Sequence, residues 1–97
     1  MATTKDYRDY ILEELSLLDS IYCRSMMGEY LLYYDGTLFG GIYDSRLLVK
    51  IVDTNEKYNM EKAIPYPVAK LMYHISNIED KEYIRDVVLD TVEGLKK

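Results

Sequence analysis

The residues of this sequence that could carry out chemistry are few and lie far apart along the chain. His74 is the only histidine and Cys23 is the only cysteine. With no second histidine, no cysteine pair and no carboxylate cluster at ligand spacing, we expect no metal site. One histidine would suffice for a Ser–His–Asp arrangement, but the sequence has no Gly-x-Ser-x-Gly motif to present a nucleophile. We therefore expect His74 to be a partly exposed strand residue and Cys23 to be a small buried hydrophobic residue.

Two other short patterns resemble catalytic or binding motifs only superficially. Glu13-Glu14 and Glu79-Asp80 pair carboxylates, yet nothing around them indicates the apolar pocket that acid–base catalysis requires. Gly40-Gly41 lies within a strand pattern and is not followed by the Lys-Ser or Lys-Thr of a phosphate-binding loop. Such a pair marks a bulge or a close approach, and here we expect it to leave room for a helix. The sequence thus predicts a non-enzymatic protein with no catalytic residue, metal or cofactor.

The size and charge of the chain narrow the function classes further. Its 97 residues, of which 48% are hydrophobic, are typical of one globular domain covering residues 1–97. No segment is apolar for long enough to span a membrane, and the polar start does not resemble a signal peptide. We expect a cytoplasmic protein without a membrane partner.

The distribution of charged and aromatic residues says more about partners. The net charge is −5, and four scattered arginines form no basic stripe, so direct nucleic-acid binding is disfavoured. Eleven of the twelve aromatic residues are tyrosines. Tyrosines fit both half-buried packing and a partner-binding face, and packing is the more frequent reason for them.

The elements that must position these residues follow from periodicity and turn signals. Residues 4–20 read as an amphipathic helix capped by Thr3 or Thr4, and residues 22–27 as an extended segment whose two methionines belong to the core. A short helix from Thr54 to about residue 60 and a final helix capped by Asp80 follow. Residues 69–75 fit either a strand or a helix that begins at Pro67, and the short length of the segment favours the strand. The fold class is α+β: an antiparallel meander with the N- and C-terminal helices packed on one face.

Two turns within residues 30–51 fix the register of the central strands. Two-residue turns at Asp35-Gly36 and Asp44-Ser45 place Tyr34 across from Thr37 and Tyr43 across from Arg46. Side chains alternate along strands, so the residues sort into two faces. The predicted core face contains Leu31, Tyr33, Leu38, Gly40, Ile42, Leu47, Val49 and Ile51. The other face is aromatic with two cations, and its predicted contact residues are Tyr30, Tyr34, Phe39, Tyr43, Arg46 and Lys50.

The same stretch resembles a known family. Arg24, Met26-Met27-Gly28, Tyr34-Asp35-Gly36, Phe39 and the segment from Arg46 to Lys50 are similar to the motifs of the TfoX N-terminal domain family of bacterial competence regulators. Pro65-Tyr66 and the segment from Met72 to Ile75 fit its later part. The resemblance implies an α+β domain with an antiparallel sheet, and a strand within residues 69–75. It also implies a regulatory role in expression of DNA-uptake genes through protein contacts, linked to a cAMP-responsive activator.

We therefore expect a regulatory, protein-interaction domain whose contact surface is the aromatic and cationic face. A second copy of the chain could cover that face instead, as a homodimer. The alternative is a small-ligand-binding domain or an unrecognised enzyme, which a deep pocket with His74 or Tyr66 in its wall would favour. Direct DNA binding ranks third.

Overall fold

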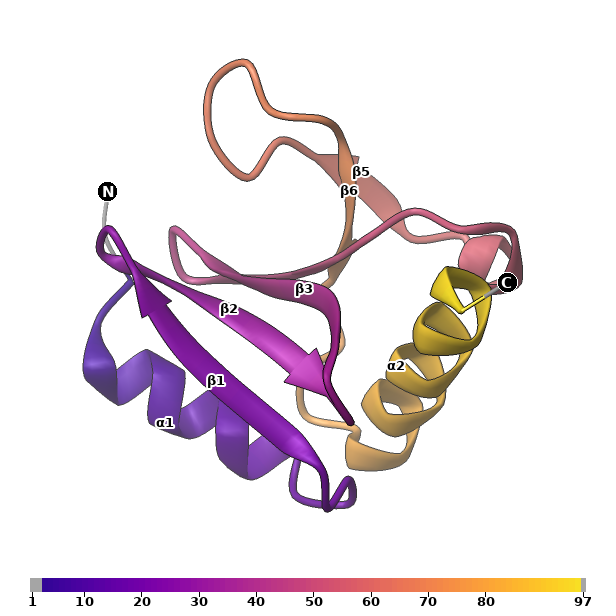
Figure 1. The fold of residues 1–97 in the computed structure, drawn as a ribbon, viewed down its shortest axis with the longest axis horizontal. Helices are drawn as coiled ribbons and strands as arrows, with labels where there is room; N and C mark the ends of the chain where they lie inside the picture. The colour runs from indigo at the N-terminus through magenta and orange to yellow at the C-terminus, as the bar shows by residue number, and fades with distance from the viewer. Residues whose placement is uncertain (1–2, 97) are drawn as a thin grey trace.

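The computed structural model describes residues 3–96 and has a helix near each end of the chain and an antiparallel sheet formed by the segments between them (Figure 1). In chain order the elements are α1 (Lys5–Glu14), β1 (Ile21–Met26), β2 (Glu29–Tyr34), β3 (Thr37–Tyr43), β4 (Arg46–Val49), the 3-10 helix η1 (Asp53–Tyr58), β5 (Glu61–Ala63), β6 (Met72–Ile75) and α2 (Lys81–Leu95). This is the predicted α+β class, with one short strand, β5, that the sequence did not indicate.

The sheet has six strands in the order β1-β2-β3-β4-β6-β5. The first four form the predicted meander, and β6 then pairs with β4 while β5 lies at the edge. Buried residues of both helices join those of the sheet in one cluster, so α1 and α2 pack on the same face. Ile11 and Leu15 enter this core from the α1 side, and Ile84, Val87 and Val88 from α2.

Both helices begin where the sequence predicts. The Thr4 hydroxyl accepts a hydrogen bond from the Tyr7 amide at 3.1 Å, and the Asp80 carboxylate accepts one from the Tyr83 amide at 3.0 Å. These contacts satisfy amides that have no partner within the helix. Helix α1 ends at Glu14, before the predicted limit at residue 20, although Leu15 and Leu18 of the predicted stripe are still buried.

Three tight turns connect β1 to β4. Asp35-Gly36 and Asp44-Ser45 have positive φ at both central positions, as a type I′ hairpin turn requires. A third turn of the same kind, Met27-Gly28, was not predicted. It places the Met27 side chain in solvent with 95% of its surface exposed, and Met26 is also exposed. The expectation that these methionines lie in the core is therefore wrong.

The register of β2 and β3 changes part of the way along the pair. Tyr34 lies across from Thr37 and Tyr33 across from Leu38, as predicted. A β-bulge then follows, and Gly40 pairs with Leu32 instead of the predicted Leu31. Because the bulge leaves Phe39 as an extra residue in β3, the predicted faces are reversed for β2 and the start of β3, whereas the later part of β3 and β4 keep theirs.

Both predicted faces are therefore wrong in part. Ile42, Leu47 and Val49 lie in the core as expected, and Ile51 packs against it. Leu31, Tyr33 and Leu38 do not belong to the core cluster, and their places are taken by buried residues assigned to the other face: Tyr30, Leu32 and Phe39. Phe39, the extra residue of the bulge, has 0% of its surface exposed.

Gly40 allows a close approach, but by a strand and not by the helix that we expected. A Cβ atom at this position would lie 2.1 Å from the Leu48 carbonyl oxygen of β4. Gly94 is the glycine that leaves room for a helix, because its missing Cβ would lie 2.4 Å from the Thr54 hydroxyl of η1.

Within residues 3–96 no helix is long and apolar enough to cross a lipid bilayer.

Candidate functional site

The sheet face opposite the helices carries the candidate site. We call it the outer face. Alternation and cross-strand pairing assign it the following residues: Tyr22, Arg24, Met26, Leu31, Tyr33, Leu38, Tyr43, Arg46, Leu48, Lys50, Met72 and His74. Tyr43, Leu48 and Met72 form a second, smaller cluster of buried residues on it.

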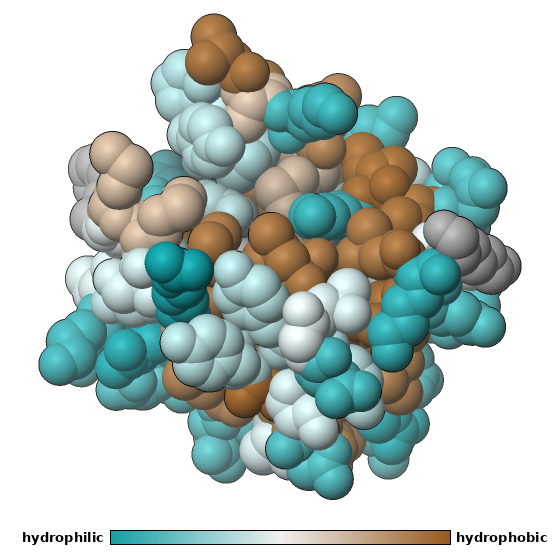
Figure 2. Space-filling view, in the orientation of Figure 1, coloured by the Kyte–Doolittle hydropathy of each residue, from teal (hydrophilic) through white to brown (hydrophobic). Residues whose placement is uncertain are grey.

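Hydrophobic residues are visible at the molecular surface near this cluster. Figure 2 shows them gathered between the sheet and the C-terminal end of α2, with hydrophilic residues around them. Residues of these same elements line a cavity of about 660 Å³. This volume lies within the range of small-molecule sites, which is roughly 300–1,000 Å³.

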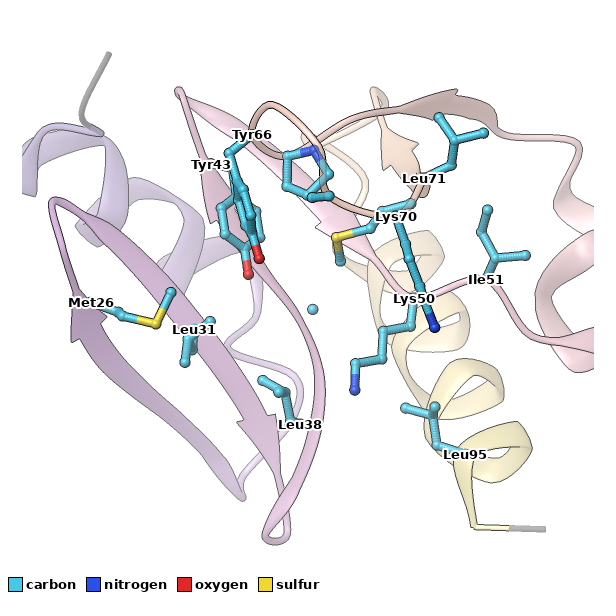
Figure 3. Close-up of a pocket in the computed structure, with 14 residues that line it drawn as sticks. Met26, Leu31, Leu38, Tyr43, Lys50, Ile51, Tyr66, Lys70, Leu71 and Leu95 are labelled. Carbon is cyan, nitrogen blue, oxygen red and sulfur yellow. The ribbon is translucent and has the colours of Figure 1, made fainter.

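The cavity is mainly apolar, with four polar side chains (Figure 3). Its apolar and backbone lining consists of Met26, Leu31, Leu38, Gly40, Ile51, Pro65, Ala69, Leu71, Met72 and Leu95. The polar groups are the hydroxyls of Tyr43 and Tyr66 and the ammonium groups of Lys50 and Lys70. Segments far apart in the sequence therefore build one site.

The loop between β5 and β6 forms one wall of this cavity. The Arg46 guanidinium donates a hydrogen bond to the Ile64 carbonyl oxygen at 3.0 Å, and the rings of Tyr66 and Tyr43 lie 6.1 Å apart. These contacts fix the start of the loop against the outer face. At the loop's tip Val68 has a φ of 64°, a strained conformation for a β-branched residue, and its side chain is fully exposed.

The structure divides the six predicted contact residues into two groups. Tyr43, Arg46 and Lys50 do lie on the outer face, where Tyr43 and Lys50 line the cavity. Tyr30 and Phe39 are buried in the helix-side core, and Tyr34 packs against it, so the assignment of these three residues is wrong. The bulge is the physical reason, since its extra residue shifts the alternation of β2 and the start of β3 by one position relative to the later part of β3 and to β4.

Sequence reasoning missed several residues of the outer face. Tyr22, Arg24 and Tyr33 are aromatic or cationic like the predicted set, and the rings of Tyr22 and Tyr33 lie 5.8 Å apart. Counting back from a turn at Met27-Gly28 would have paired Tyr22 with Tyr33. Lys70 lies in a loop without periodicity, so no sequence pattern could place it in the cavity.

His74 and Cys23 lie in strands, and neither lines the cavity. His74 is a half-buried residue of β6, as predicted, and it does not line the cavity. Burial and the neighbouring Arg46 lower its pKa. Burial raises the pKa of the half-buried Cys23 thiol, which disfavours the reactive thiolate. Residues 3–96 contain no group of three metal-ligating side chains.

Comparison with known proteins identifies the family. The sequence model of the TfoX N-terminal domain matches residues 13–85. The chain is also 33% identical to a protein of Spirochaeta aurantia described as an uncharacterized 12.7 kDa protein in the trpE 5' region, over 98% of this chain and 85% of that protein. The match to the domain model covers β1 to β6 and the beginning of α2. This chain therefore belongs to the TfoX N-terminal domain family.

Proposed function

We propose that this protein is a non-enzymatic regulatory domain that binds a protein partner through its outer face. The observation that carries the proposal is the set of apolar and cationic side chains that the fold leaves uncovered there. Tyr22 has 61% of its surface exposed, and Arg24 and Met26 are also exposed. Tyrosine, methionine and arginine are the residues in which protein interfaces are enriched.

Membership of the TfoX N-terminal domain family supports a role in the regulation of transcription. TfoX acts in the control of competence, and we propose that this chain acts in transcriptional regulation of DNA-uptake genes through protein contacts. The net charge of −5 supports action through a protein and not through direct contact with DNA.

Affinity capture from a lysate of the native cell, followed by titration of the purified captured protein, tests partner binding. We expect the Tyr22→Ser, Arg24→Glu double variant to bind the partner at least about tenfold more weakly than the wild type, because truncating interface anchors typically costs more than about 1 kcal/mol each. Transcript levels of DNA-uptake genes should fall in cells that carry only this variant.

The matched control is the double variant Tyr10→Ser, Arg85→Glu, which changes the same residue types on the helices instead of the outer face. We call the double variant Tyr22→Ser, Arg24→Glu the β1 variant. Equal binding by the wild type and the β1 variant would contradict the proposed surface. Sedimentation of the purified protein tests the homodimer: self-association lost in the β1 variant would assign the outer face to a second copy.

A small-ligand-binding domain is the second candidate function. The specific observation in its favour is the cavity, which has Tyr66 in its wall. Tyr22 and Arg24, which the first test changes, do not line the cavity, so partner binding and ligand binding can be tested separately.

A further inference from the structure

We propose that the cavity binds a small amphipathic carboxylate, with its apolar chain or ring against the leucine-rich wall and its carboxylate between Lys50 and Lys70. The inference deepens the second candidate function by naming the ligand class. It does not depend on partner binding at β1.

The wall of the cavity selects an apolar body. Leucine, isoleucine and methionine supply seven of its fourteen lining residues, from β1, β2, β3, β6 and α2 and from the segments after β4 and before β6. Placing an apolar group against such a surface removes hydrocarbon from water, at roughly 25 cal/mol per Å² buried. The volume of about 660 Å³ leaves room for a chain of several carbon atoms or for an aromatic ring.

The charges in the cavity select an anionic head group. Lys50 and Lys70 line the same cavity, and none of its described lining residues is an aspartate or a glutamate. In the part of the chain that the structure describes, neither ammonium group forms an ion pair with a carboxylate. Acidic residues outnumber basic ones in this chain, 17 to 12, yet none of the described acidic residues neutralises these two cations. A bound anion could form charge-assisted hydrogen bonds with the half-buried Lys50 and the exposed Lys70 beside this apolar wall.

The two tyrosine hydroxyls add hydrogen-bond donors to the same site. Figure 3 shows Tyr43 and Tyr66 side by side with their hydroxyls pointing the same way, and their rings are 6.1 Å apart. Burial, followed by the nearby Tyr66 and Glu29, raises the pKa of Tyr43, so its hydroxyl keeps its proton at neutral pH. A protonated hydroxyl can donate to a carboxylate oxygen, and an ammonium can form a charge-assisted bond to it.

Titration of the labelled protein with decanoate, followed by backbone amide NMR shifts, tests the site. We expect saturable shifts confined to the cavity-lining residues. Decanol, which has the same chain without the charge, should bind at least about tenfold more weakly, the change expected when charge-assisted hydrogen bonds are lost. Acetate, which has the charge without the chain, should produce no saturable shifts.

A lysine double variant assigns the head group. Lys50→Gln, Lys70→Gln should bind decanoate about tenfold or more weakly while its affinity for decanol stays unchanged. The matched control is Lys5→Gln, Lys62→Gln, which removes two exposed lysines that do not line the cavity. It should bind decanoate as the wild type does.

Several outcomes would overturn the inference. These are shifts outside the cavity, equal affinity for decanoate and decanol, or equal decanoate affinity of the two lysine variants. Lysine-dependent binding of a leucine- and glutamate-rich peptide, without binding of decanoate, would assign the cavity to a protein segment. Self-association lost only in Lys50→Gln, Lys70→Gln would assign it to a second copy. Loss of partner capture by the β1 variant bears only on the proposed function.

Discussion

Asp90 is the residue on which the polar contacts between η1 and α2 converge. Its carboxylate accepts a hydrogen bond from the Tyr58 hydroxyl at 2.5 Å and pairs with the Lys57 ammonium at 3.0 Å. Its backbone carbonyl accepts a bond from the Thr54 hydroxyl. Burial alone would raise the pKa of this carboxyl, but the bonds from Tyr58 and Lys57 outweigh it and lower the pKa below 3.8. The charged form of Asp90 therefore stabilises the contact between η1 and α2.

We predict that Asp90→Asn lowers the free energy of unfolding at neutral pH by about 1–3 kcal/mol, the cost of weakening hydrogen bonds to a charged group. Because the pKa of Asp90 is lower in the folded than in the unfolded chain, its stabilisation is complete above the unfolded value of 3.8. It is lost as the pH falls through the folded value. Urea unfolding from neutral to strongly acidic pH should show the two proteins converging in acid.

The control for this residue is Asp86→Asn, which changes an exposed carboxylate of the same helix that pairs with its neighbour Arg85. It should alter stability by less than about 0.5 kcal/mol. A constant difference between Asp90→Asn and the wild type at every pH would contradict the assigned role of the carboxylate.

At the scale of elements, the bulge between β2 and β3 decides which residues the sheet presents to each side. Leu32 is fully buried in the core, whereas the adjacent Leu31 is half-buried on the outer face and lines the cavity. Without the bulge, Leu31 and not Leu32 would face the helices. Which of these two neighbouring leucines is buried in the core therefore indicates the register between β2 and β3.

We predict that Leu32→Ala lowers the free energy of unfolding by about 2–5 kcal/mol, because it opens a cavity in the core. Leu31→Ala should cost less, about 1 kcal/mol, since this side chain is only partly removed from water. Urea denaturation of both variants at neutral pH measures the difference. A larger loss for Leu31→Ala would indicate the register without a bulge.

At the scale of the whole molecule, α1, the sheet and α2 share one core. Ile11 from α1, Ile42 from the sheet and Val87 from α2 are fully buried members of the same cluster. Since no helix has a separate core, we expect the chain to unfold as one cooperative unit. This is the thermodynamic form of the expectation that residues 1–97 make a single domain.

We predict that Ile11→Ala lowers the free energy of unfolding by about 2–5 kcal/mol and leaves one cooperative transition. Curves followed by far-UV circular dichroism and by tyrosine fluorescence should coincide. Leu17→Ala, which changes an exposed residue beyond α1, is the control and should cost less than about 0.5 kcal/mol. Transitions that separate between the two probes would show that α1 unfolds independently.

The sequence by itself determined the local features of this fold. The caps at Thr4 and Asp80, the turns at Asp35-Gly36 and Asp44-Ser45 and the order of most elements depend on neighbouring residues, and all were predicted. The motifs of the family could also be recognised in the sequence, because each consists of residues that are close together along the chain. These features need only backbone conformations and hydrogen bonds that span a few positions.

The tertiary structure alone decided the faces of the sheet and the cavity. Gly40-Gly41 signalled a bulge or a close approach, but not which residue would be extra, and that choice reversed Tyr30, Tyr34 and Phe39. Packing decides the position of Phe39. Burial of its ring against the helices is favourable, and this compensates for the locally disrupted hydrogen bonding between β2 and β3 at the bulge. Lys70 joins Lys50 in the cavity only because the loop folds back over the sheet, a contact between distant segments that no local pattern encodes.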